Sequence, residues 1–501
     1  MSKPTVILRR CPSYDVDRIR GIVREGLQSL GDLPRGRVLV KPNGVIAHRR
    51  FFPHAFTRPE FLDGVLGAVR DTAPDVQELA VGERCGITIP TRMVFAHAGW
   101  TRVVKRHRAK AYYFDEEPQV EVKLTREPRL RDFLYTPAPV ARADYLINCP
   151  KFKAHPWTTV TFALKNFIGI QNDPDRLIDH DHRLDEKIAD LQEIAQQRFI
   201  AIDAIEAGQD RMLTPVPFDL GLVIMGDNPV AVDATCCRML GLDPAAIGHV
   251  RLAHEKGFGP LDEGEIALDG DVTLEQARGQ AKGFRVGLIR VEKYFKDTRI
   301  TALAGPPPEK VPGDYCWGGC PGAIEEAIEI VRQLDERADE KMKPLTVVFG
   351  GYEGPITPRA GEKVVFIGDC ARWEGTLDGQ PVKIESLYRD RGHHDPHRAR
   401  ADGIFMKMAK VFWSLFRRRK QRTLRAPGCP VSVAEHTLLL ARLGGTRNPY
   451  FVPASAVPFM RAYVTSKVVR CFRRLFGMPA RIRAALPEAS PAPKSLPPAS
   501  E

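Results

Sequence analysis

Three cysteines in the second half of the chain have a spacing that suits a metal centre. Cys316 and Cys320 are separated by Trp-Gly-Gly, Pro321 follows the second of them, and Cys370 stands at a Gly-Asp turn after an apolar run. The glycines let the backbone fold back so that thiolates can converge on one side of a loop, as an iron–sulfur cluster requires. We therefore predict a [4Fe–4S] cluster with one iron left for a fourth ligand or a substrate. A zinc site completed by a His or Asp, or three unpaired buried cysteines, are the alternatives.

A basic segment in the first half of the chain predicts a site for an anion. Lys151, Lys153 and His155 alternate, so in an extended segment they share one face, and Lys165 and Asn166 follow near an expected helix. Several cationic groups on one face suit a carboxylate or phosphate. Because crowded cations lower one another's pKa, Lys165 or His155 is the expected proton donor or acceptor.

Four further residues are assigned to the same substrate site. Lys41 and Asn43 lie in a Lys-Pro-Asn-Gly turn after a short apolar strand, where backbone amides are exposed. Asp203 and Asp233 could orient the lysines or bind a metal. The alternative for the two aspartates is that each caps a helix or forms a buried ion pair. The alternative for the lysines is a solvated loop in which one structural lysine pairs with Asp203 or Asp233.

Other motifs weigh against several common functions. The chain has no Walker A pattern and no G-x-G-x-x-G after a strand, so neither ATP nor NAD is predicted. The histidine-rich stretches 179–182 and 393–397 are expected to be solvated loops, although His180 and His182 could approach the lysines as a lid.

The elements that must position these residues alternate between strands and helices over the first 270 residues. This alternation predicts an α/β fold with a mostly parallel sheet and flanking helices. We expect an α/β domain over 1–300, a smaller α/β unit with the three-cysteine site over 301–400, a basic amphipathic helical region over 401–485, and a disordered tail over 486–501. The expected strands are Thr5–Leu8, Val38–Val40, Leu79–Val81, Tyr145–Asn148, Phe199–Ile202 and Leu220–Met225; the expected helices are Glu60–Arg70, Thr91–Ala98, Asp185–Gln197 and Pro229–Leu240.

Several separated motifs over residues 35–270 resemble the domain of unknown function 362 family. They include Val40-Lys-Pro-Asn43, Asn148-Cys-Pro-Lys-Phe-Lys-Ala-His155, Thr161-Phe-Ala-Leu-Lys-Asn-Phe-Ile-Gly169 and Val230-Ala-Val-Asp233-Ala. The resemblance implies an α/β fold, iron–sulfur binding in some members, and no general reaction. Some members carry a ferredoxin-type cysteine run, and this chain has a different cysteine arrangement.

The charge of the chain is concentrated at its C-terminal end. The formal net charge is +12, and residues 401–501 hold 18 Lys and Arg against four Asp and Glu. Residues 403–476 predict two helices with one apolar and one basic face, which suit an anionic membrane surface or an acidic partner; packing on the protein's own core is the alternative. Nucleic acid is an unlikely partner because few aromatic residues interleave the basic ones.

The function predicted from the sequence is an iron–sulfur protein that performs or supports a redox step on an anionic small molecule, with a redox partner protein. A non-redox or zinc-binding enzyme using Lys and His acid–base chemistry is one alternative, and a membrane-associated assembly or carrier factor is another. No apolar run resembles a secretory signal, so a cytoplasmic protein is expected, with peripheral contact at the inner face of the membrane.

Overall fold

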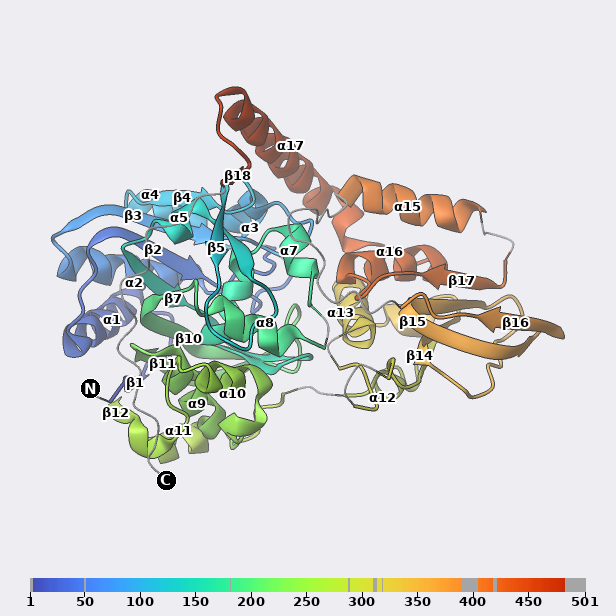
Figure 1. Ribbon diagram of the computed structural model, residues 1–501, viewed down its shortest axis with the longest axis horizontal. Helices are drawn as coiled ribbons and strands as arrows, with labels where there is room; N and C mark the ends of the chain where they lie inside the picture. The colour runs from blue at the N-terminus through green and yellow to red at the C-terminus, as the bar shows by residue number, and fades with distance from the viewer. Residues whose placement is uncertain are drawn as a thin grey trace.

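The computed structural model describes residues 3–48, 51–180, 182–286, 289–309, 313–317, 319–388, 404–417 and 421–482. Its larger part is built on a ten-stranded mixed sheet in which the main path has the order β12-β1-β11-β10-β7-β2-β3-β4 (Figure 1). The strands of this path are β1 (Thr5–Arg10), β2 (Gly36–Pro42), β3 (Val76–Glu83), β4 (Lys110–Tyr113), β7 (Tyr145–Cys149), β10 (Gln197–Gln209), β11 (Val216–Gly226) and β12 (Ala267–Gly270).

The centre of this sheet is parallel, as the alternation of strands and helices predicts. β2 pairs in parallel with both β3 and β7, and β7 pairs in parallel with β10. β11 runs antiparallel to both β10 and β1. The predicted fold class, a mostly parallel α/β sheet with flanking helices, is therefore confirmed.

Helices cover both faces of the sheet, and each face has its own apolar core. The helices on one face are α1 (Val16–Leu30), α2 (Pro59–Thr72), α3 (Thr91–His97) and α4 (Trp100–Arg106); those on the other are α6 (Ala163–Asn166), α8 (Leu184–Leu191), α9 (Pro229–Met239) and α10 (Gly248–Glu255). The helices expected from the sequence did not include α1, although its start is encoded locally. The Asp15 carboxylate accepts hydrogen bonds from the amides of Asp17 and Arg18, and Gly31 ends the helix in the left-handed conformation.

A second, smaller sheet forms the other part of the molecule. β13, β14 and the first half of β15 are parallel, and β16 forms a hairpin with the second half of β15. β17 also pairs with β15, and α13 packs against α16 on one face of this sheet. The elements are β13 (Ile300–Ala304), α13 (Cys320–Arg332), β14 (Leu345–Gly351), β15 (Lys363–Leu377), β16 (Gln380–Ile384), β17 (Thr423–Ala426) and α16 (Val433–Gly444). The segment expected to be a separate helical region thus contributes a strand and a helix to this unit.

The two remaining long helices are α15 (Ile404–Arg417) and α17 (Pro453–Leu475). α17 extends from the second unit back over the first, where it contacts α3 (Figure 1). Arg473 of α17 forms an ion pair with Glu117 at 2.7 Å. After α17, β18 (Arg481–Ile482) pairs with β5 (Gln119–Lys123), which pairs with β6 (Phe133–Pro137). Residues 393–397 and the tail from 486 lie outside the described residues.

Among the described residues, no helix has the length and apolar character needed to cross a membrane.

The shorter elements near the basic segment complete the description. They are β8 (Lys151–His155), β9 (Thr159–Thr161), the 3-10 helix η1 (Phe167–Ile170) and α7 (Asp173–Leu177). β8 pairs with β10 and with β9, which extends the large sheet beyond its carboxyl edge.

Candidate functional site

Strand β8 places its basic residues on one face, but they meet different partners. Lys151 is fully buried, and its Nζ lies 3.1 Å from Asp203 Oδ2 and 2.7 Å from the Tyr14 hydroxyl. Asp203 also accepts hydrogen bonds from the Tyr14 hydroxyl and the Arg58 amide. The sequence left open whether a lysine pairs with Asp203. In the structure Lys151 forms this pair, so its ammonium group has a carboxylate partner inside the protein.

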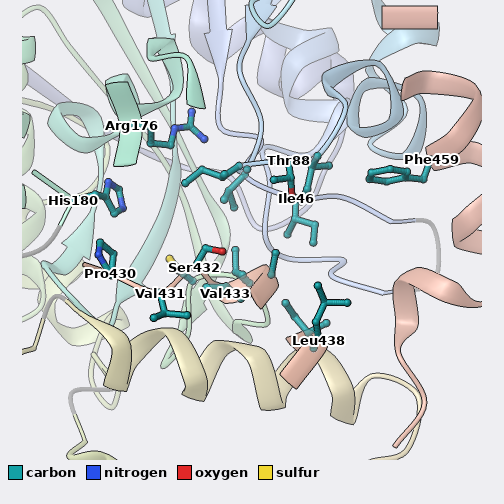
Figure 2. A pocket seen from close by; sticks show the side chains of 18 of the residues that line it. Ile46, Thr88, Arg176, His180, Pro430, Val431, Ser432, Val433, Leu438 and Phe459 are labelled. Carbon is teal, nitrogen blue, oxygen red and sulfur yellow. The ribbon is translucent and has the colours of Figure 1, made fainter. Parts of the chain in front are cut away.

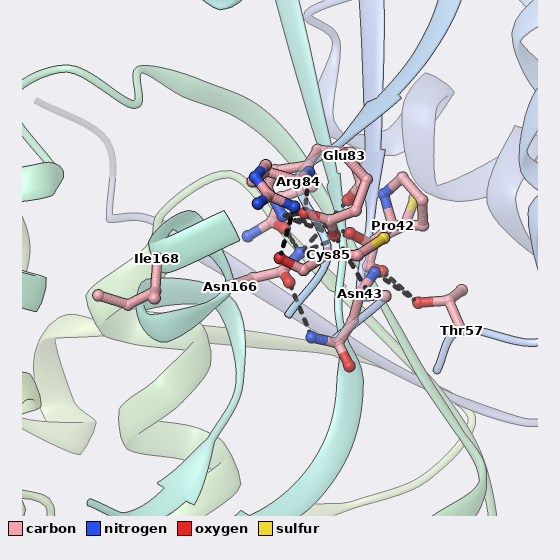
Figure 3. A network of polar contacts seen from close by, with 12 residues as sticks. Pro42, Asn43, Thr57, Glu83, Arg84, Cys85, Asn166 and Ile168 are labelled. Atoms are coloured by element: carbon pink, nitrogen blue, oxygen red, sulfur yellow. Dashed lines mark hydrogen bonds and ion pairs between the residues drawn. The ribbon is translucent and has the colours of Figure 1, made fainter. Parts of the chain in front are cut away.

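Lys41 lies at the end of β2 in a similarly closed network. Figure 3 shows other members of this network, including Glu83, Asn43 and Asn166. Lys41 Nζ lies 3.0 Å from both carboxylate oxygens of Glu83, and both side chains are inaccessible to solvent. Burial lowers the pKa of Lys41 and raises that of Glu83, while their mutual attraction opposes both shifts. The sequence did not predict the pairing of Glu83 with Lys41, because the two residues stand 42 positions apart in the chain.

Three asparagine side chains continue this network toward α6. Asn43 Nδ2 donates to Asn166 Oδ1 at 3.1 Å, and Asn166 Nδ2 donates to Asn148 Oδ1 at 2.8 Å (Figure 3). The structure thus brings Asn43 and Asn166 together with Lys41, as predicted, in a framework that joins β2, β7 and α6. Their assignment to substrate stays a prediction.

Asp233 caps a helix. Its two carboxylate oxygens accept hydrogen bonds from the amides of Ala163 and Leu164, at 2.8 and 3.1 Å, at the start of α6. Burial raises the pKa of Asp233 to about 7. This short helix carries Lys165, so Asp233 positions the element that presents that lysine.

Lys153 occupies an intermediate position. Its Nζ donates to the carbonyl oxygens of Ala55 and Met212, at 2.8 and 3.2 Å, and the charge of Glu326 is a secondary influence. Burial lowers the pKa of Lys153 to about 7. Lys153 is held by neutral oxygens, in contrast to Lys41 and Lys151.

Lys165, His155 and His180 line one cavity, and each has a side-chain nitrogen that forms no hydrogen bond with the described residues. Among the described residues, Lys165 Nζ forms no hydrogen bond or ion pair, and His155 Nε2 and His180 Nδ1 are buried without a hydrogen-bond partner. Burial, together with the charges of Lys153 and Arg176, lowers the pKa of Lys165 to about 7. Burial and neighbouring cations hold the pKa of both histidines well below its usual value, so both imidazoles are neutral near pH 7.

His155 is oriented by its own backbone. Its Nδ1 accepts hydrogen bonds from the amides of Trp157 and Thr158, at 3.1 and 3.3 Å. The proton of the neutral ring is therefore on Nε2, which points to a cavity where no acceptor is present among the described residues. The expected solvated loop at 179–182 is wrong at His180, which is buried and lines the same cavity as Lys165, with its ring 5.1 Å from that of Trp157.

The cavity has a volume of about 370 Å³ and lies between the two units (Figure 2). One wall comes from the first unit and includes Ile46, Thr88 and Arg176. The other comes from the C-terminal segment and includes Val431, Leu438 and Phe459 (Figure 2). These two segments are more than 250 residues apart in the chain, and no local pattern could place them against each other.

The three predicted cysteines come together at the start of α13. A Cβ on Gly368 would lie 3.3 Å from Cys320 Sγ and 3.4 Å from Cys370 Sγ, and a Cβ on Gly319 would lie 2.6 Å from Cys316 Sγ. Burial, the neighbouring Cys370 and then Cys316 raise the pKa of the Cys320 thiol. Gly368 leaves space beside the sulfur atoms of Cys320 and Cys370, and Gly319 leaves space beside that of Cys316. Among the described residues, no group of three or more His, Cys, Asp or Glu side chains is arranged to hold a metal ion, so the iron–sulfur cluster and zinc both stay predictions.

A fourth cysteine, the exposed Cys429, lies in the chain segment that contacts this group. Gly428 donates its amide to Asp369 Oδ1 at 2.9 Å and accepts from the Asp369 amide at 3.0 Å, and Val431 donates its amide to Cys320 Sγ at 3.2 Å. Cys429 thus lies between two residues that contact the site. It was not among the cysteines expected from the sequence, although Cys429-Pro430 repeats the Cys-Pro pair at 320–321.

The cysteine group and the basic cavity are adjacent. Val431, which donates to Cys320 Sγ, also lines the cavity. Trp157, a second lining residue, packs on α13 two residues after Cys320, since a Cβ on Gly322 would collide with its indole Nε1. The two candidate sites therefore share a wall.

The comparisons with known proteins find a family match within the first unit. The family model described as a domain of unknown function (DUF362) matches residues 38–238. This match confirms the resemblance found in the sequence over residues 38–238.

One curated protein and two solved structures are similar to this chain at low sequence identity. A thylakoid-associated protein of Synechocystis sp. is 24% identical over 271 residues, which cover 51% of this chain and 80% of that protein. The lactate racemase apoprotein of Thermoanaerobacterium thermosaccharolyticum is 12% identical, with 88% of this chain and 81% of that chain covered and a TM-score of 0.31. A Thermotoga maritima protein is 10% identical, with 85% and 82% covered and a TM-score of 0.31.

Proposed function

We propose that this chain is an iron–sulfur-binding protein that performs or supports a redox step on an anionic small molecule. The observation that carries the proposal is the shared wall between the cysteine group and the cavity with Lys165. A ligand in that cavity would lie against Val431, whose amide contacts Cys320 Sγ.

Cys316, Cys320 and Cys370 would hold the cluster, with Cys429 as the fourth thiolate. Two local features oppose the raised pKa of the Cys320 thiol: Cys320 is the first residue of the 13-residue helix α13, and the Val431 amide donates to its sulfur. When bound, a [4Fe–4S] cluster supplies one-electron redox chemistry, for which a redox partner protein would be the electron donor or acceptor.

Lys165 would bind the anionic group of the ligand, and the neighbouring histidines would supply neutral hydrogen-bonding groups. Since the pKa of Lys165 is about 7, this residue can carry a proton to or from the ligand near neutral pH. His155 Nε2–H has no acceptor among the described residues and would donate a hydrogen bond to the same group. Lys41, Lys151 and Asp203 would support the site from their buried pairs.

The test is metal analysis of anaerobically purified protein with a matched pair of cysteine variants. Cys429→Ala is expected to lower the iron and acid-labile sulfide content and to change the absorption near 400 nm. Cys471→Ala, at another exposed cysteine on α17, is expected to match the wild type. Equal iron content in the two variants would remove Cys429 from the ligand set, and iron-free wild-type protein after reconstitution would overturn the proposal.

A non-redox enzyme or a zinc-binding protein is the alternative that the same metal measurement separates. The four thiols also suit tetrahedral zinc, and Lys165 and His155 would then act by acid–base chemistry alone. Stoichiometric zinc without sulfide would support that function.

A membrane-associated assembly or carrier function is a second candidate, favoured by the exposed apolar face of α17. Val464, Val468, Phe472 and Leu475 are 46–74% exposed, while Arg473 turns inward to Glu117. Such a helix can lie on an anionic membrane surface. Binding to anionic vesicles tests this candidate independently of iron.

A further inference from the structure

The cavity between the two units has one polar and one apolar end. At the polar end lie Lys165, His155 and His180. His155 is 1% exposed and His180 is 9% exposed, and each has a ring nitrogen without a hydrogen-bond partner among the described residues. Unsatisfied buried polar atoms are costly, so they indicate that a ligand completes this end.

The charge at the polar end is positive or neutral. Arg176 also lines the cavity, and its guanidinium is held by the carbonyl oxygens of Arg84, Cys85 and Ile168. No Asp or Glu is among the described lining residues. An anionic head group is therefore the complement of this end.

The apolar end is formed by the C-terminal helices. Phe405 and Met408 come from α15, Phe459 and Met460 from α17, and Leu438 from α16. Flexible methionines and large rings adapt to apolar chains of different shape. Phe405 and Met460 are 43% and 42% exposed, so this end reaches the surface beside the exposed apolar face of α17.

We propose that the ligand of this cavity is an amphiphile with a carboxylate head and a single unbranched apolar tail, its head at Lys165 and its tail between α15, α16 and α17. This ligand would occupy the cavity beside the cysteine group. The inference rests on the proposed function only for the redox step. The volume of about 370 Å³ lies within the usual range of small-molecule sites. The opening beside α15 and α17 would give such a ligand a path from an apolar surface.

The first test is calorimetric titration with hexanoate, octanoate, decanoate and dodecanoate, and with the matching alcohols. Affinity for the acids is expected to rise about fourfold with each added methylene until the cavity is filled. Decanol is expected to bind about tenfold more weakly than decanoate, because it cannot form the charge-assisted contact. Equal affinity for acid and alcohol, or the absence of any dependence on chain length, would overturn the inference.

Two variants separate the two ends of the cavity. Lys165→Met is expected to remove the preference for acid over alcohol and to keep the dependence on chain length. Phe459→Ser is expected to weaken dodecanoate binding about tenfold or more and hexanoate binding much less. Phe472→Ser changes an exposed ring on the same helix outside the cavity and is expected to bind like the wild type.

Iron content measured on the same samples keeps the two proposals distinct. Iron-free protein that binds dodecanoate would overturn the cluster and support the amphiphile. Iron-loaded protein that binds no acid of the series would overturn the amphiphile and leave the cluster in place.

Discussion

Two regions of the first unit contain lysines with little access to solvent, and they differ in what surrounds the ammonium group. Lys41 and Lys151 are buried, whereas Lys165 is partly exposed. Lys41 and Lys151 each lie against a carboxylate, of Glu83 and Asp203, with further hydrogen bonds closing the networks. Lys165 faces a cavity and has no such partner among the described residues. Removing one partner of a matched pair would leave an uncompensated charge inside the protein, whereas a lysine without a carboxylate partner at a cavity can form an ion pair with a ligand.

The largest effect is expected from breaking a closed pair. Glu83→Gln leaves the Lys41 ammonium buried without a carboxylate, which should lower the free energy of unfolding by about 3–5 kcal/mol, measured by urea denaturation. Glu78→Gln, on the same strand, breaks an exposed pair with Lys110 and should cost about 1 kcal/mol or less. Equal losses in the two variants would show that the Lys41 pair is not a structural unit.

The pH dependence of ligand binding should come next in size. The pKa of Lys165 is lowered to about 7, so its ammonium is present below that pH and is lost as pH rises through it. Binding of decanoate should therefore weaken about tenfold per pH unit above about pH 7, by titration calorimetry. Decanol serves as the control and should show no such change, and a flat profile for decanoate would remove Lys165 from the head-group site.

Removing the unmatched lysine should have a smaller effect on stability. Lys165→Met preserves most of the side-chain volume and removes a charge that has no partner among the described residues, so the free energy of unfolding should stay within about 1 kcal/mol or rise. Lys41→Met, in contrast, leaves the Glu83 carboxylate buried without its lysine and should lower the free energy of unfolding by about 3–5 kcal/mol. Comparable losses would mean that Lys165 has a structural partner and that the contrast between the regions is wrong.

The smallest change in stability is expected on the exposed face of α17. Phe472→Ser should alter the free energy of unfolding by about 0.5 kcal/mol or less, because the ring is 55% exposed. The same change should reduce cosedimentation with anionic vesicles if this face binds membrane. Unchanged sedimentation would leave the membrane-associated function without its main support.

The sequence predicted the sheet well because strand–helix alternation is a local signal. Each of the six expected strands lies within an observed one, and Tyr145–Asn148, for example, lies within β7. The metal site predicted at Cys316, Cys320 and Cys370 stays a prediction, because spacing and glycines alone do not show that thiols converge.

The partners of the lysines could not be predicted from the sequence, because they depend on contacts between distant segments. Asp203 stands 52 residues from Lys151 and Glu83 stands 42 from Lys41, so composition alone could not tell which lysine is matched. The place of Cys429 was not predicted for a similar reason: its segment was expected to be part of a basic helical region, whereas β17, just before it, pairs with β15, which carries Cys370.

The central claim, that the cysteine group beside the Lys165 cavity holds iron, is tested most directly by iron and acid-labile sulfide measurement on wild-type protein purified without oxygen. We predict about four irons and four sulfides per chain, with broad absorption near 400 nm that is lost in Cys320→Ala. Protein that stays colourless and free of iron after reconstitution would contradict the claim.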